Sequence, residues 1–280
     1  MSPIRKIRGE MPFLDHLEEL RWRILWSVIS IIIAAIFGFW LVWRFNVLEL
    51  LVDPIRVAYD DPDLKLQYLA PGDAFFVTLK LGIYTGVIMA FPILAYHVWS
   101  FLSPALEKRE KRAIVPALYL GMVLFVGGMA LAYFAAVPVT LEFFKAFQAE
   151  SLNAQLEINK TLGWIVKMLL AFGAVFELPI VIMILSVIGL VTPKFLRSKR
   201  RHAIVGITIL ASVITPGDVL VLTVMMMIPL VFLYELGIWL SVIIYRAKDK
   251  RREELEKELE PDPTPPTGSV EVSETPRHEE

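Results

Sequence analysis

The chain has 280 residues, 56% of them apolar, a formal net charge of −1 and no cysteine. The apolar residues gather in long runs between charged segments, which indicates a membrane protein, because a helix needs about 20 apolar residues to cross the hydrocarbon. The missing cysteines exclude disulfides, thiol catalysis and cysteine-ligated metals. No short apolar core with a small-residue cleavage site opens the chain, so we expect the first span to be retained.

The N-terminal part of the chain predicts two continuous helical segments. Between residues 13 and 24 apolar residues recur at helical spacing among charged ones, which is typical of an amphipathic helix at a membrane interface. We expect it to lead into a first span at residues 25–43. The loop that follows, 44–72, predicts a short interfacial helix at 46–52 that ends before Asp53 and Pro54, because such dipeptides stop helices.

Three further long apolar runs predict the second, third and fourth spans. They cover residues 73–102, 113–137 and 162–190, and the loop between the last two is polar. Pro92 lies within the second span and predicts a kink there.

The last apolar region, residues 203–245, is divided by a turn at 215–218. It predicts a hairpin of two spans, and we expect both to be short, with the first only about a dozen residues long. The total is six spans in an all-α protein. We expect a membrane domain over 1–248 and a charged, disordered cytoplasmic tail over 249–280.

Loop charges predict the orientation of the spans. Lys and Arg are concentrated in the N-terminal segment, in the second and fourth loops and after the last span, and they are sparse in the loops between. By the positive-inside rule both termini are cytoplasmic, which requires an even number of spans. We therefore expect a multi-pass membrane protein with both termini in the cytoplasm.

Two carboxylates are predicted at membrane depth. Glu177 lies in the fourth span beside Pro179, where an ionisable side chain is costly unless it is paired, hydrated or protonated. We interpret it as an intramembrane polar site, with a structural hydrogen bond inside the bundle as the alternative. For Glu235, nearer the cytoplasmic end of the sixth span, we favour a structural carboxylate that either snorkels to the interface or is paired with arginine.

Cytoplasmic carboxylates among basic residues are candidates for binding guanidinium groups. Glu19 and Glu110 are two of these. Residue spacing alone favours ion pairs within a helix for these carboxylates. Glu19 and Arg23, for example, stand four residues apart, as the partners of helical ion pairs do. The four histidines lack metal-ligand spacing, and no nucleophile motif or phosphate-binding loop is present, so we expect no catalytic residue, metal or cofactor. The basic clusters are interpreted as topology signals and not as nucleic-acid contacts.

Four motifs, in order, resemble the TatC family. Residues 13–23 are similar to its N-terminal signature, 103–116 to its first cytoplasmic loop, 171–179 to its fourth helix and 215–218 to its last periplasmic turn. The family's first periplasmic loop also matches at Asp53 and Pro54. The resemblance extends over about residues 10–248.

The resemblance implies a receptor for twin-arginine signal peptides of folded precursor proteins. It implies a concave, glove-like bundle that works with TatA and TatB and is oligomeric with TatB. It also implies that the proton-motive force drives export across the cytoplasmic (inner) membrane, in which the protein lies. It implies that signal peptides are bound by Glu19, Glu110, Leu17, Leu20, Arg21, Phe101 and Pro104. It also matches Glu177 to a buried family glutamate, and Pro54 and Asp218 to positions of periplasmic-side function.

Two other functions remain open from the residues themselves. One is a secondary transporter or proton channel centred on Glu177, although no internal repeat supports it. The other is a membrane scaffold without transport activity.

Overall fold

A computed structural model describes residues 13–102, 114–147, 155–214 and 221–259. Helices account for nearly all of these residues, and one isolated bridge joins Gln67 to Glu157. The elements in chain order are α1 (Phe13–Arg44), α2 (Val47–Tyr59), α3 (Asp73–Leu102), α4 (Ile114–Leu131), the π-helical turn η3 (Ala132–Ala136), α5 (Val137–Phe147), α6 (Ile158–Phe176), α7 (Leu178–Val187), α8 (Pro193–Ser198), α9 (Arg200–Ile214) and α10 (Val221–Leu259). The prediction of an all-α protein is confirmed.

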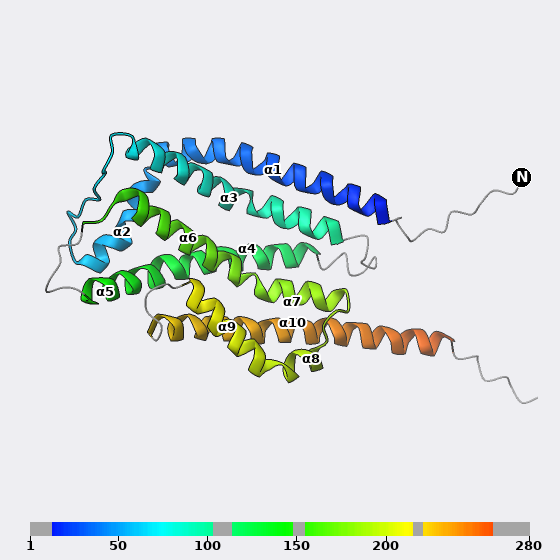
Figure 1. Cartoon of the computed structure of the whole chain (residues 1–280). Coiled ribbons are helices and arrows are strands. Elements are labelled where there is room, and N and C mark those ends of the chain that lie inside the picture. The colour runs from blue at the N-terminus through cyan, green and yellow to red at the C-terminus, as the bar shows by residue number, and fades with distance from the viewer. Residues whose placement is uncertain (1–12, 103–113, 148–154, 215–220, 260–280) are drawn as a thin grey trace, which may run out of the picture.

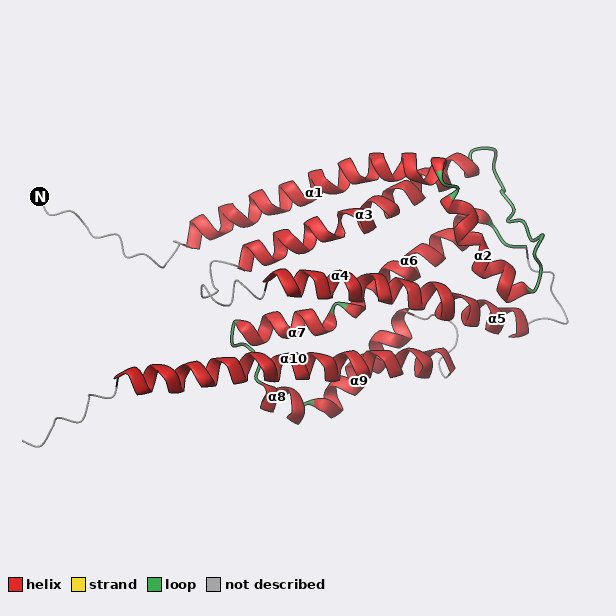
Figure 2. Cartoon of the chain, turned by 180° about the vertical axis from the view of Figure 1, so that it is seen from behind, coloured by secondary structure: helices red, strands yellow, loops and turns green. Residues whose placement is uncertain are grey.

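The long helices lie side by side, with their ends gathered at two ends of an elongated bundle (Figures 1 and 2). The start of α1, the end of α3, the start of α4 and the end of α10 share one end, which we call the terminal end. Helix α2, the end of α5 and the start of α6 share the opposite end, which we call the α2 end. The first and last described helices therefore have their outer termini on the same side.

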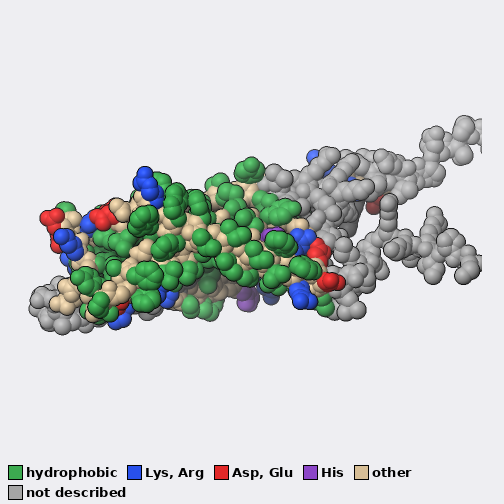
Figure 3. All heavy atoms as spheres, turned by 90° about the horizontal axis from the view of Figure 1, so that it is seen from above, with side chains coloured by type: hydrophobic (Ala, Val, Ile, Leu, Met, Phe, Trp, Pro, Cys, Tyr) green, Lys and Arg blue, Asp and Glu red, His purple; other side chains and the backbone are tan. Residues whose placement is uncertain are grey.

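Five stretches in the described part of the chain are long and apolar enough to cross a membrane. They are Leu17–Arg44, Asp73–Phe101, Pro116–Ala146, Ile158–Val187 and Met226–Arg251. Figure 3 shows the face over α1 and α3 covered with apolar side chains, with charged side chains toward the two ends. This distribution is that of a membrane-embedded protein.

The last two helices differ from each other in length. Helix α9 has 15 residues, as a short span would, so the count of six spans stays a prediction. Helix α10 has 39 residues, and the prediction of a short sixth helix is wrong. It also continues through 249–259, which we predicted to be disordered. That segment is rich in Glu, Lys, Arg and Leu, which are strong helix formers even where no apolar face is buried.

Helix α10 is tied to the helices before it by polar contacts. The Ser186 hydroxyl of α7 donates to the Ser241 hydroxyl of α10 over 2.7 Å, and both residues are buried. The ammonium group of Lys248 donates to the carbonyl oxygen of Val187 at the end of α7 over 2.7 Å. The Tyr234 hydroxyl donates to the carbonyl oxygen of Leu196 in α8 over 2.9 Å. The Lys248 contact satisfies a carbonyl at the end of α7, where the last carbonyls have no partner within their own helix.

Helices α1 and α3 pack with their backbones in close approach. A Cβ atom added at Gly38 would lie 2.5 Å from the carbonyl oxygen of Gly82, and one added at Gly86 would lie 2.4 Å from the backbone of Ala35. Gly82 and Gly86 stand four residues apart, so both lie on the face of α3 that meets α1. Small residues at this spacing permit close packing of helices in membranes.

The third span is longer than we predicted. Instead of ending at Val137 and giving way to a polar loop, the helix continues through η3 and α5 to Phe147. The amide of Val137 donates to the carbonyl oxygen of Ala132, five residues earlier. This wider turn directly precedes Pro138, which cannot donate and whose ring crowds the preceding turn, so the π turn lets the helix pass the proline.

The fourth span is divided at Glu177. Helix α6 ends at Phe176 and α7 begins at Leu178, with Pro179 in the first turn of α7. A proline is well tolerated there because the first amides of a helix have no intrahelical partner. The helix break therefore places the Glu177 side chain at a bend inside the predicted span.

Candidate functional site

The terminal end of the bundle holds the N-terminal residues to which the resemblance assigns signal-peptide binding. Glu19 lies in the second turn of α1, where its carboxylate accepts hydrogen bonds from the guanidinium of Arg23; the bond from Arg23 Nε is 2.9 Å long. Each side chain is 22% exposed. The helical ion pair expected from their spacing is thus present. The Glu19 carboxylate is therefore a hydrogen-bond acceptor near the start of the helix.

The other described residues of this group lie on the same two helices. Leu17 is 45% exposed, Leu20 is half-buried and Arg21 is exposed, all in the first turns of α1. Phe101 is half-buried at the end of α3, which Figure 1 places beside the start of α1. Glu110 and Pro104 lie outside the described residues, in the segment that connects α3 to α4.

Glu177 faces α4 from the bend between α6 and α7. A Cβ atom added at Gly121 of α4 would lie 3.0 Å from Glu177 Oε2, so the carboxylate packs against the glycine. Its Oε1 atom is buried and has no hydrogen-bond donor among the described residues. A buried carboxylate oxygen without a donor is costly, which makes Glu177 a polar position of the kind that often has a functional role in membrane proteins.

Glu235 is a structural carboxylate in the described part of the chain, as we favoured. Its Oε2 atom accepts a hydrogen bond of 2.7 Å from Arg200 at the start of α9. The pair joins the two helices of the C-terminal hairpin. Both side chains are nearly half exposed, so the pair contributes little to stability.

Helix α2 carries Pro54 at the opposite end of the bundle. The prediction that this helix ends at Val52 is wrong, because it runs on to Tyr59 with Pro54 inside it. Five of its residues pack into the bundle and stabilise it there: Leu51, Val52, Pro54, Ile55 and Ala58. Asp218, the second residue with an expected periplasmic-side role, lies outside the described residues.

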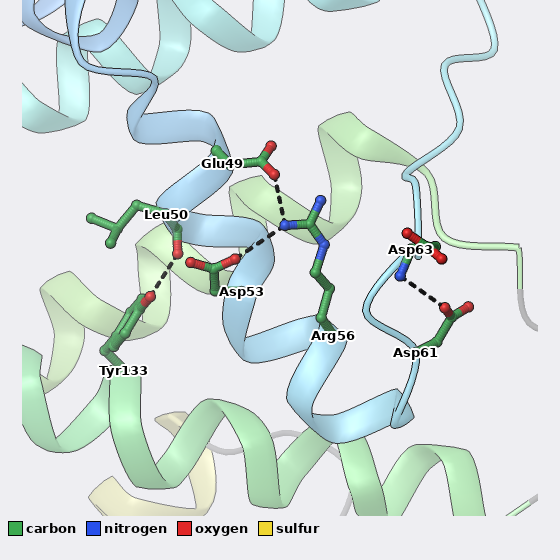
Figure 4. Close-up of polar contacts among 7 residues, drawn as sticks. All are labelled: Glu49, Leu50, Asp53, Arg56, Asp61, Asp63 and Tyr133. Carbon is green, nitrogen blue, oxygen red and sulfur yellow. Dashed lines mark hydrogen bonds and ion pairs between the residues drawn. The ribbon is translucent and has the colours of Figure 1, made fainter.

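A charged cluster covers the outer face of α2 (Figure 4). The Arg56 guanidinium donates to Glu49 over 2.6 Å and to Asp53 over 3.1 Å. The hydrogen bond with Glu49 is the main reason that the pKa of Arg56 is raised above its usual value. On the inner side, the Tyr133 hydroxyl donates to the carbonyl oxygen of Leu50 over 2.7 Å.

An apolar cavity of about 460 Å³ lies beneath α2. Its walls come from α1, α2, α3, the α4–η3 segment and α6, and they include Leu41, Leu50, Tyr84, Tyr133 and Leu169. Almost all of the surface that lines it is apolar. The cavity is therefore suited to apolar contacts and not to the binding of charged groups.

Sequence patterns did not predict the contacts of three residues in these regions. Gly121 gives room to the Glu177 carboxylate, Tyr133 contacts α2, and Lys145 donates to the carbonyl oxygen of Tyr59 over 2.9 Å. Tyr133 and Lys145 contact residues more than 80 positions away, and no local pattern indicates such a pair.

Sequence comparison identifies the family. The family described as Sec-independent protein translocase protein (TatC) matches residues 15–229. Proteins named Sec-independent protein translocase protein TatC from Desulforapulum autotrophicum and Aquifex aeolicus are 37% and 36% identical over 87% and 85% of this chain, and over 88% and 98% of their own lengths. The Escherichia coli O6:H1 protein of the same name is 32% identical over 89% of this chain and 94% of its own.

Solved structures give the same result. The crystal structure described as the twin arginine translocase receptor TatC aligns with a TM-score of 0.68 at 34% identity, covering 82% of this chain and 99% of that one. A second, determined in the detergent DDM, aligns with a TM-score of 0.69 at 35% identity, covering 81% of this chain and 99% of that one. These relatives are named as protein translocase proteins, which favours protein transport over a proton-coupled small-solute transporter. The chain belongs to the TatC family of Sec-independent protein translocase proteins.

Proposed function

We propose that this chain is the receptor subunit of a twin-arginine protein-export system. In this proposal it binds the paired arginines of signal peptides on folded precursor proteins. The observation that carries the proposal is family membership along most of the chain, together with solved relatives described as twin arginine translocase receptors. The receptor role is stated for those relatives and is proposed here for this chain.

The proposed binding surface is at the terminal end of the bundle, on the cytoplasmic side. Glu19 and Glu110 accept the two guanidinium groups, and Leu17, Leu20, Arg21, Phe101 and Pro104 surround them. Support comes from α1, in which the Glu19 carboxylate accepts hydrogen bonds, and from the end of α3, which lies beside the start of α1 (Figure 1). Carboxylates bind arginine with two parallel hydrogen bonds, which lysine cannot supply, so the surface discriminates between the two residues.

The proposed topology has six spans, both termini in the cytoplasm and the cytoplasmic membrane as the location. Five long spans alone would leave the ends of the chain on opposite sides. The start of α1 and the end of α10 share one end of the bundle (Figures 1 and 2), which supports α9 as a sixth, short crossing. A span of 15 residues is accommodated by local thinning of the bilayer.

TatA and TatB are the proposed partners, and the assembly with TatB is oligomeric. The proton-motive force drives the export step in this proposal.

Glu177 is proposed as a polar contact inside the membrane, and Pro54 and Asp218 as residues of periplasmic-side function. The unsatisfied Oε1 atom of Glu177 supports a role beyond packing.

Export of a folded reporter in cells tests the proposal. The host lacks its own TatC but retains TatA and TatB, and the reporter carries a twin-arginine or a twin-lysine signal peptide. We expect export of the twin-arginine reporter only. Equal export of both reporters, or none while full-length protein is present in the membrane, would contradict the proposal.

A further inference from the structure

The strongest unexplained feature of the structure is the hydrogen bond from Tyr133 to the carbonyl oxygen of Leu50, four residues before Pro54 in α2. Pro54 is buried within α2 and has no amide hydrogen. In a regular helix that amide would donate to the carbonyl oxygen of Leu50, four residues earlier. The Tyr133 hydroxyl donates to this same oxygen over 2.7 Å (Figure 4). The Tyr133 hydroxyl therefore supplies the hydrogen bond to Leu50 that an amide at position 54 would make in a regular helix.

A second donor from the same long helix reaches the other end of α2. The Lys145 ammonium group donates to the carbonyl oxygen of Tyr59 over 2.9 Å, and it lies 5.6 Å from the centre of the Tyr59 ring. The last carbonyls of a helix have no intrahelical partner, so Lys145 satisfies one of them. Helix α2 is thus held near its middle and at its end by Tyr133 and Lys145.

The π turn accounts for how one helix presents both donors to α2. Tyr133 and Lys145 are twelve residues apart, and an ideal α-helix turns about 100° per residue, which would leave them about 120° apart around the axis. The i→i+5 bond of η3 accommodates one extra residue, which reduces the separation to about 20°. Both side chains then project from the same face of the helix.

We propose that Tyr133 is a positioning residue matched to Pro54, and that η3, which carries the helix past Pro138, also aligns Tyr133 and Lys145 against α2. The phenol supplies the hydrogen bond that the proline cannot, and the pair fixes α2 over the apolar cavity. This inference concerns the placement of α2 and does not depend on signal-peptide binding. Its relevance to export rests on the proposed function of Pro54.

A double-mutant cycle in purified protein tests the match. Tyr133→Phe leaves the Leu50 carbonyl without a donor, so we expect the unfolding midpoint in detergent to fall by about 2–4 °C. Pro54→Ala restores an amide that bonds to this carbonyl. In the Pro54→Ala background we therefore expect Tyr133→Phe to cause less than half of that fall.

Two control variants separate this coupling from general effects. Tyr84→Phe removes a hydroxyl from the wall of the same cavity and is expected to leave the midpoint unchanged. Lys145→Met removes the donor to Tyr59, whose carbonyl gains nothing from Pro54→Ala, so its effect is expected to be the same in both backgrounds. An equal effect of Tyr133→Phe in both backgrounds, or no effect in the original chain, would overturn the proposal.

Hydrogen exchange gives an independent measurement if Pro54→Ala does not fold. In Tyr133→Phe we expect faster amide exchange in α2, with α3 and α6 unchanged, because the lost bond is local. Exchange that rises throughout the bundle, or nowhere, would contradict a positioning role. Signal-peptide binding that fails while this coupling holds would reject only the proposed function.

Discussion

Without a ligand, the Glu19 carboxylate already accepts hydrogen bonds from the Arg23 guanidinium. The pair has i,i+4 spacing and its side chains are 22% exposed, so it contributes only a few tenths of a kcal/mol. A ligand guanidinium forms charge-assisted hydrogen bonds worth about 1.5–3 kcal/mol each. Arg23 already makes hydrogen bonds of this kind to Glu19, so under the proposed function a ligand arginine must displace Arg23 or share the carboxylate with it.

Glu177 depends on the absence of a side chain at Gly121. We expect Gly121→Ala to push the carboxylate aside, because the new methyl group would lie 3.0 Å from Oε2. The unfolding free energy should fall by about 1 kcal/mol, as in mild overpacking. Thermal unfolding in detergent measures this change.

Gly127→Ala on the same helix is the matched control, because a Cβ atom there meets no atom within 4 Å. In a Glu177→Ala background the cost of Gly121→Ala should disappear. A cost that persists there would show that the carboxylate is not the neighbour that matters.

At the level of helices, the apolar runs predicted most of the fold, and the errors have identifiable causes. The helix beyond Val137 was missed because a proline normally ends a helix, whereas η3 carries this helix past Pro138. Helix α2 was ended too early for the same reason, since its buried face and the Tyr133 donor compensate for Pro54. Such compensation comes from distant residues, so no local pattern reveals it.

The glycines illustrate the same limit. The predicted third span contains Gly121, Gly127 and Gly128, of which Gly121 and Gly128 face other helices, whereas Gly127 faces open space. The closest approach involves Gly38, Gly82 and Gly86, which we did not single out. The four-residue spacing of Gly82 and Gly86 was visible in the sequence, but the partner helix was not.

The contact between α1 and α3 should be the packing interface most sensitive to added volume. Gly86→Ala would place a methyl group 2.4 Å from the backbone of Ala35, which cannot move as a side chain can. We expect a loss of at least about 1–3 kcal/mol in unfolding free energy. Gly163→Ala in α6, where a Cβ atom meets nothing within 4 Å, is the control. Equal midpoints for the two variants in thermal unfolding would refute the close approach.

At the scale of the whole molecule, the number of membrane crossings decides which ends of the helices face the cytoplasm, where the signal peptide is proposed to bind. The chain contains no cysteine, so each introduced cysteine is a unique label. With a membrane-impermeant maleimide on intact cells, we expect labelling of Val57→Cys and Gly217→Cys from outside. Lys250→Cys should be labelled only after the membrane is opened. Protection of Gly217→Cys, with Val57→Cys labelled, would mean that α9 does not cross the membrane.

The resemblance to TatC was readable from four motifs, and family membership is now shown. The candidate binding site was predictable only as residue identities. Glu19 and Phe101 come from opposite ends of two helices, and only the fold brings those ends together.

Binding of a labelled twin-arginine peptide to the purified protein is the most direct test of the central claim. We expect saturable binding that weakens at least about tenfold when both arginines are replaced by lysine, a loss of about 1.4 kcal/mol. Glu19→Ala and Glu110→Ala should weaken binding to a similar extent, whereas Glu18→Ala, an exposed neighbour on α1, should not. Undiminished binding in both the Glu19→Ala and the Glu110→Ala variants, measured in folded protein, would contradict the account.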